Sequence, residues 1–320
     1  MDEFRPRGLG EIIDRAIALY VRNFVVFMSI MLCLLLPMAA AEYFLMPDSS
    51  ATNAAFFQTI VESRGGGHQT PEEKARTAKV LNQNQLTPQQ LALLLLILLV
   101  SPLATVATAV AVAHLYVAQK ADWRASWRAA LRRWPRIVGL TCLELIALGI
   151  TGFTGFFALT IGTVVGVLAL RSVPPFAFAV LAIAAVLGLV WFVVFLMQAL
   201  LVFSFALYAV AIEDMPVFRA FRSGFFRVFD RTAFRSALVA IIAMAVEFGI
   251  LILSMGGQLL FSALWHNHAV NVAYGTLVQT LFTGFLTVFI AVYYFDVRTR
   301  AEGLDLQARL QPVHGVLGTP

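Results

Sequence analysis

The sequence predicts an all-α polytopic membrane protein, and three observations carry this prediction. The 320 residues are 60% hydrophobic and only 13% charged, which is unusual for a water-soluble domain. The apolar residues gather in six long runs, and most basic residues lie in short stretches between them. Each run supplies the roughly 20 apolar residues that a helix needs to cross the hydrocarbon core.

We place the six membrane-spanning helices at residues 24–46, 91–118, 137–170, 176–212, 236–264 and 271–295. They form one transmembrane domain over residues 1–310, followed by a flexible tail at 311–320. The third and fourth runs are longer than a bilayer requires, and a turn is expected between them at 171–175. The long outer loop covers residues 47–90 and has a helix start at Thr70, so we expect a short helix at 71–81.

The positions of lysine and arginine predict the orientation. Eighteen of the 23 lie before the first run, between the second and third, between the fourth and fifth, or after the sixth. Cytoplasmic loops are enriched in these residues, so both termini are predicted to be cytoplasmic. An alternative is cleavage of a signal peptide near Ala41, but the acidic N-terminal residues and the apolar stretch that continues to Met46 argue against it.

Amphipathic segments begin near residues 9, 123 and 217, before the first, third and fifth runs. In the second and third of these segments, arginines share the polar face: Arg124, Arg128 and Arg132, then Arg219, Arg222 and Arg227. We therefore predict three units, each an interfacial helix followed by a transmembrane hairpin, with guanidinium groups that reach anionic headgroups. Basic cytoplasmic loops that contain aromatic residues would give a similar pattern without any repeat.

Four polar residues inside the runs are candidates for a function within the membrane: His114, Glu144, Gln198 and Glu247. An ionised carboxylate there costs at least ~2.5 kcal/mol, so each glutamate needs a partner or a proton. Their depth along the helices pairs His114 with Glu144 and Gln198 with Glu247. We interpret these groups as interhelical contacts, with a proton or cation relay as the alternative. Gly149, Gly152 and Gly155 share one helix side and predict close packing there.

No known catalytic motif is present: the sequence has no phosphate loop, GxSxG, HExxH or CxxC pattern. His266 and His268 alone make an incomplete metal site, so we expect neither a metal nor a cofactor. The net charge of +5 reflects the loops between apolar runs, and no nucleic-acid binding is expected.

Three stretches carry a family resemblance: "RPRGLGEIIDRAIALYVRNF", "FSFALYAVAIEDMPVFRAFRSGFFRV" with Glu213, and "AVYYFDVRTRAEGLDLQ" with Tyr294, Asp296, Arg298, Arg300 and Glu302. They resemble the membrane domain of bacterial glycerophosphoryl diester phosphodiesterases, which also occurs as a free-standing protein. In those enzymes a separate catalytic barrel accompanies the domain, and these 320 residues contain no such barrel. The resemblance therefore implies membrane anchoring or partner engagement, and it does not license the expectation of phosphodiesterase activity.

The resulting hypothesis is a non-enzymatic module of the bacterial plasma membrane that acts as a scaffold or accessory subunit. Its basic cytoplasmic face, including Asp296, Arg298, Arg300 and Glu302, would contact anionic lipid headgroups or a membrane or cytoplasmic protein partner. The second hypothesis is a transporter or permease for a lipid or small solute that uses Glu144 and Glu247. A membrane-embedded lipid enzyme is the third.

Overall fold

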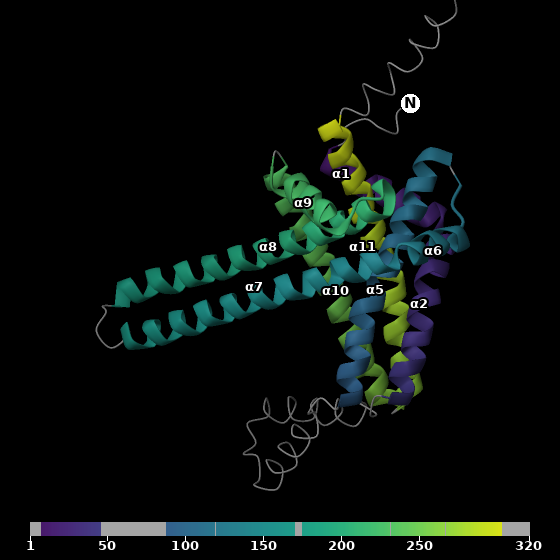
Figure 1. The fold of residues 1–320 in the computed structure, drawn as a ribbon. Coiled ribbons are helices and arrows are strands. Elements are labelled where there is room, and N and C mark those ends of the chain that lie inside the picture. The colour runs from purple at the N-terminus through teal and green to yellow at the C-terminus, as the bar shows by residue number, and fades with distance from the viewer. Residues whose placement is uncertain are drawn as a thin grey trace, which may run out of the picture. The chain divides into compact units, whose positions relative to one another are not determined.

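The computed structural model describes residues 8–45, 88–118, 120–169, 175–230, 232–265 and 267–302. Within these ranges the chain forms nine α-helices and no strand (Figure 1). In chain order the helices are α1 Leu9–Arg22, α2 Phe24–Leu45, α5 Pro88–Ala118, α6 Trp123–Arg132, α7 Trp134–Ala169, α8 Pro175–Glu213, α9 Val217–Phe229, α10 Ala233–Trp265 and α11 His268–Glu302.

Six of these helices contain a stretch that is long and apolar enough to cross a membrane. The stretches are Phe24–Leu45, Leu91–Val117, Trp134–Gly155, Gly188–Glu213, Ala233–Ser262 and His268–Ala301. The prediction of an all-α chain with six long apolar helices is therefore confirmed.

The predicted helix ends agree with the structure to within about three residues, except at the end of the last helix. There α11 continues seven residues beyond the predicted end at 295 and includes Asp296 and Arg300, which pair with each other one turn apart. Both α2 and α5 run through an internal proline, Pro37 and Pro102 respectively. The expected helix at 71–81, the turn residues 171–174 and the tail at 311–320 lie outside the described residues.

The short helices α1, α6 and α9 begin at residues 9, 123 and 217, where the amphipathic segments were expected to start. On α9 the buried positions are Ala220, Gly224 and Val228, which recur every fourth residue. The larger Phe218 lies on the exposed part of the same helix. That these helices lie in a membrane interface stays a prediction.

The contacts within the chain define two compact units. Unit 1 contains residues 1–12, 129–244 and 290–320, and unit 2 contains residues 13–128 and 245–289. Four helices, α1, α6, α10 and α11, contribute residues to both units.

In unit 1, α8 lies beside α7 and packs closely against α9 (Figure 1). A Cβ atom on Gly224 would lie 2.5 Å from the carbonyl oxygen of Val202 and 3.1 Å from the backbone nitrogen of Ala206. Glycine at this position therefore lets α9 approach the backbone of α8 directly. Rings on the two helices add contacts on either side, with Phe203 5.3 Å from Phe221 and Phe195 6.2 Å from Phe229.

In unit 2, α2 packs against α5 through Met31, Leu34 and Ala104. The indole nitrogen of Trp127 donates a hydrogen bond to the carbonyl of Ile30 at 3.3 Å. Tyr20 on α1 is 8% exposed and donates its hydroxyl proton to the carbonyl of Leu281 at 2.7 Å. Burial raises the pKa of Tyr20 to about 12, which keeps this hydroxyl protonated.

The expected close packing along the glycines of the third predicted span occurs at one of the three positions. A Cβ atom on Gly155 would lie 2.5 Å from the ring of Phe192, so this glycine makes room for an aromatic side chain of α8. The prediction is wrong for Gly149 and Gly152, where no atom lies within 4 Å of an added Cβ. Spacing alone did not show which of the three positions faces a side chain of α8.

Candidate functional site

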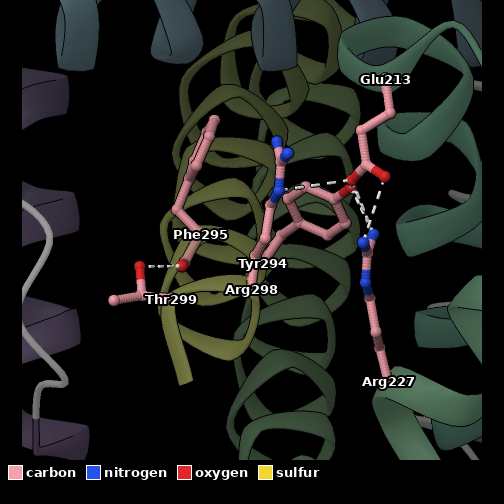
Figure 2. Close-up of polar contacts among 6 residues, drawn as sticks. All are labelled: Glu213, Arg227, Tyr294, Phe295, Arg298 and Thr299. Atoms are coloured by element: carbon pink, nitrogen blue, oxygen red, sulfur yellow. Dashed lines mark hydrogen bonds and ion pairs between the residues drawn. The ribbon is translucent and has the colours of Figure 1, made fainter. Parts of the chain in front are cut away.

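The candidate site in unit 1 is a group of charged and aromatic side chains from three helices. Glu213 is the last residue of α8, Arg227 lies on α9, and Tyr294 and Arg298 lie one turn apart on α11 (Figure 2). Glu213 and Tyr294 are 81 positions apart in the chain, so only the tertiary fold brings them together.

Arg227 holds the Glu213 carboxylate with both of its terminal nitrogens. Nη1 lies 2.8 Å from Oε1 and Nη2 lies 3.1 Å from Oε2, and the two side chains are only 11% and 9% exposed. The Tyr294 hydroxyl accepts a hydrogen bond from Arg227 Nη1 at 2.7 Å and donates one to Glu213 Oε1. Nε of Arg298 lies 3.7 Å from the same carboxylate oxygen. Figure 2 shows these groups converging on Glu213.

Aromatic rings enclose this ion pair. The Tyr294 ring meets Phe205 edge-on at 5.1 Å and Tyr208 edge-on at 5.4 Å, and all three side chains are buried. The Arg227 guanidinium lies 5.2 Å from the centroid of the Tyr294 ring. The low exposure strengthens the charge-assisted hydrogen bonds and makes the loss of either charged partner costly.

A second ion-pair network lies close by in sequence and joins α10 to α11. The Asp296 carboxylate is 3% exposed and lies 3.1 Å from Arg235 Nη2 and 2.9 Å from Arg300 Nε. Next to it, the hydroxyls of Ser236 and Tyr293 are hydrogen-bonded at 2.8 Å. The two networks together contain two carboxylates and four guanidinium groups, so they carry a net charge of +2.

The chemistry of these networks favours a structural clamp over a catalytic centre. Both oxygens of Glu213 are hydrogen-bonded to Arg227, and Asp296 is held by two arginines. These guanidinium groups occupy oxygen lone pairs that a substrate or a transferred proton would otherwise use. In the part of the chain that the structure describes, no three or more His, Cys, Asp or Glu residues gather as a possible metal site.

An arginine-lined cavity of about 380 Å³ lies in the same unit. Its lining residues are Ala129, Arg132, Arg133, Pro135, Arg136 and Asp214. Arg136 Nη1 lies 2.7 Å from Asp214 Oδ1 and 3.2 Å from the Asp214 carbonyl oxygen, and Arg133 Nε lies 3.4 Å from Oδ1. Arg132 makes no hydrogen bond or ion pair with any other described residue. Two guanidinium groups, those of Arg133 and Arg136, thus share one carboxylate. With Arg132 included, the lining residues carry a net charge of +2.

The backbone of Asp214 brings its carboxylate to these arginines. Its φ of 52° is the one positive value among the described non-glycine residues, and aspartate tolerates this left-handed conformation better than most side chains. The turn ends α8 and is closed by a hydrogen bond from the Met215 amide to the Ala209 carbonyl at 3.4 Å. The side chain therefore projects from the end of α8 toward the first turn of α7.

The remaining arginines predicted to contact lipid or a partner divide into two groups. Exposed side chains are those of Arg124, Arg128, Arg132, Arg219 and Arg222. Arg227, Arg298 and Arg300 take part in the ion pairs described above, and Arg300 is also exposed. Glu302 is the last residue of α11.

The four polar candidates within the spans do not form one site inside either unit. Glu144 and Gln198 belong to unit 1, where Gln198 Nε2 donates a hydrogen bond to the carbonyl of Ala233 at 3.0 Å. His114 and Glu247 belong to unit 2, where His114 is exposed and Glu247 lines a cavity.

Sequence reasoning missed several residues that the structure brings together. Arg133, Arg136 and Asp214 were not singled out, although basic residues after α6 and an acidic residue after α8 were both visible in the sequence. Glu42 was also passed over, because it lies near the end of an apolar run.

No protein-family model, no curated protein and no solved structure matches this chain.

Proposed function

We propose that this protein is a non-enzymatic module of the bacterial plasma membrane that binds anionic lipid headgroups on a basic cytoplasmic face. The observation that carries the proposal is the cavity lined by Arg132, Arg133 and Arg136, in which Asp214 is the one acidic residue. Guanidinium groups pair with phosphate through parallel hydrogen bonds, and a cavity with excess positive charge favours such an anion.

The position of the cavity along the chain supports a headgroup ligand. The arginines flank the start of α7, and Asp214 directly follows α8, so the cavity lies at the ends of two apolar helices. Trp134 beside it is 55% exposed, and Phe218 on the following helix is 79% exposed. Exposed aromatic rings and arginines at the end of a membrane span are typical of headgroup depth.

The proposed orientation follows from the distribution of basic residues. The ends of the spans that carry the arginines face the cytoplasm, as do both termini, because 18 of the 23 basic residues lie there. The resemblance of three sequence stretches to a bacterial membrane domain is the reason for proposing the bacterial plasma membrane.

Native mass spectrometry of the detergent-purified full chain tests this proposal. Wild-type protein should retain phosphatidylglycerol more tightly than phosphatidylcholine. The double substitution Arg133→Gln and Arg136→Gln should weaken phosphatidylglycerol binding by about 2 kcal/mol, roughly thirtyfold, at about 1 kcal/mol per arginine.

Lys120→Gln is the matched control, because it removes one positive charge from an exposed position outside the cavity. Its lipid affinity should stay close to that of wild type. Equal affinity of the wild-type protein for the two lipids would contradict the proposal. Crosslinking that then recovered one protein at Arg132 would make the basic face a partner-binding surface instead.

A further inference from the structure

Unit 2 contains a half-open polar cavity between helices that are apolar enough to cross a membrane. Its volume is about 280 Å³, and it lies between α10 and α11 beside the last turn of α2. Its polar lining includes Glu42, Glu247, Ser254, Gln258, Thr276 and Gln279. All six lie within candidate membrane spans.

The lining side chains form matched stripes on the two long helices. On α10, Glu247, Ser254 and Gln258 follow one another at intervals of seven and four residues, which keeps them on one helical face. On α11, Thr276 and Gln279 are three residues apart and share a face in the same way. Polar groups are therefore concentrated on the sides of the two helices that border the cavity.

A glycine makes room for one of these groups. A Cβ atom on Gly275 would lie 2.7 Å from Gln258 Nε2 and 3.8 Å from Ser254 Oγ. The amide of Gln258 thus lies directly over the α11 backbone, in space that any other residue at position 275 would occupy.

Most of these polar groups have no partner within the described part of the protein. Glu42, Glu247, Gln258 and Gln279 make no hydrogen bond or ion pair with any other described residue, and the Thr276 hydroxyl donates to its own helix at Val272. Glu42, Glu247 and Gln279 are exposed at the surface of unit 2, and Gln258 is partly buried. A polar group left unsatisfied in a membrane span is costly, so such groups are usually bound to a ligand, to water or to another helix.

The charge of the lining selects the class of ligand. Two lining residues are carboxylic acids and none is Lys, Arg or His, although the nearby His268 acts electrostatically on Glu42. All the acceptors are carboxylate, amide or hydroxyl oxygens, which are the ligands that hard cations prefer. The volume has room for an ion together with several water molecules.

We propose that the cavity between α10 and α11 is a binding site for a small hard cation, with Glu247 as its principal anionic ligand and Gln258 as an oxygen donor. The site uses residues of unit 2, so it is independent of the proposed lipid-binding cavity of unit 1. The sequence analysis paired Glu247 with Gln198 by depth. In the proposed site Glu247 instead lies with polar groups of α2, α10 and α11.

The test measures the melting temperature of the detergent-purified full chain in NaCl, CaCl₂ or N-methylglucamine chloride at equal ionic strength. A cation that binds only the folded state stabilises it, and this stabilisation grows with the logarithm of the cation concentration once that concentration exceeds the dissociation constant. Na⁺ or Ca²⁺ should raise the melting temperature above its value in N-methylglucamine, and whichever cation does so identifies the ligand. Titration calorimetry with that cation should then show at least tenfold weaker binding for Glu247→Gln.

Glu144→Gln is the matched control, since it removes a carboxyl group from another apolar helix outside the cavity. Its affinity for the cation should stay within twofold of wild type. Gly275→Ala provides a second variant in case Glu247→Gln fails to fold. Its new methyl group displaces the flexible end of Gln258, so cation affinity should fall severalfold while the melting temperature in N-methylglucamine changes little.

Three results would overturn the proposal. The first is an equal melting temperature of the wild-type protein in all three salts. The second is a cation-induced rise that survives unchanged in both Glu247→Gln and Gly275→Ala. The third is an equal loss of affinity in Glu144→Gln and Glu247→Gln, which would show that the effect is not local to the cavity.

Discussion

Glu213 and Arg227 form a two-pronged ion pair in which both side chains are about nine-tenths buried. Asp214 directly follows Glu213 in the chain, but its side chain is 64% exposed. Two adjacent carboxylates thus make ion pairs in opposite environments, which provides an internal comparison of a buried pair with an exposed one.

Glu213→Ala should destabilise the protein by about 3 kcal/mol, because it leaves the Arg227 guanidinium buried without its counter-charge. Asp214→Asn should change stability by less than about 1 kcal/mol, since exposed ion pairs contribute little. Thermal unfolding of both variants in the same detergent measures the difference. Equal losses of stability would contradict the burial of the Glu213 pair.

Tyr294→Phe should cost about 1 to 2 kcal/mol, because it removes the hydroxyl that bridges Arg227 and Glu213 but keeps the buried ring. A double-mutant cycle with Glu213→Gln should show coupling between the two sites, since they share a hydrogen bond. Tyr43→Phe serves as the control, because the Tyr43 side chain is exposed. Additive effects of Tyr294→Phe and Glu213→Gln would show that the bridge is not formed.

Gly224→Ala should strongly destabilise unit 1, because its methyl group would lie 2.5 Å from a backbone oxygen of α8 that cannot move aside easily. Gly188→Ala on α8 should be neutral or slightly stabilising, since nothing lies within 4 Å of its added Cβ and alanine favours a helix over glycine by roughly 0.5 to 1 kcal/mol. Limited proteolysis and thermal unfolding distinguish the two variants. Equal stability of both would mean that α9 does not rest on the α8 backbone.

Asp214→Asn should increase the affinity for phosphatidylglycerol severalfold, because the Asp214 carboxylate competes with a lipid phosphate for Arg133 and Arg136. Asparagine also tolerates the left-handed backbone at this position, so the turn should be kept. The native mass spectrometry described for the arginine variants measures the change. Weaker lipid binding by Asp214→Asn would show that the carboxylate positions the arginines instead of competing for them.

Stability should fall between pH 10 and 12 in a way that depends on Tyr20. Its pKa in the folded protein is raised to about 12 from an ordinary value near 10. The stabilisation is therefore fully present below pH 10 and is lost as the pH rises through 12. Tyr20→Phe should show a smaller decline over this range in a pH series of thermal unfolding. If the stability of wild type and of Tyr20→Phe fell equally over this range, a group other than Tyr20 would be responsible.

The spans were predictable because hydropathy is a sum over many residues, and no single side chain decides it. The site was only partly predictable. Arg227 lies on the polar face of its segment, but sequence could not show that this side faces Glu213, which belongs to another helix. The stripe of Glu247, Ser254 and Gln258 could have been found from its spacing. The place of Glu42 at the edge of the same cavity could not, because it depends on how α2 lies beside α10 and α11.

The contact at Gly224 also has a practical consequence for following movement in the protein. Because the backbone of α9 lies directly against that of α8, we expect α9 to move together with the C-terminal end of α8. A spectroscopic label at Phe218→Cys, on the exposed part of α9, would thus report the motion of α8 from an accessible position. Cys33 and Cys142 are both free and exposed, so they must be replaced before such labelling.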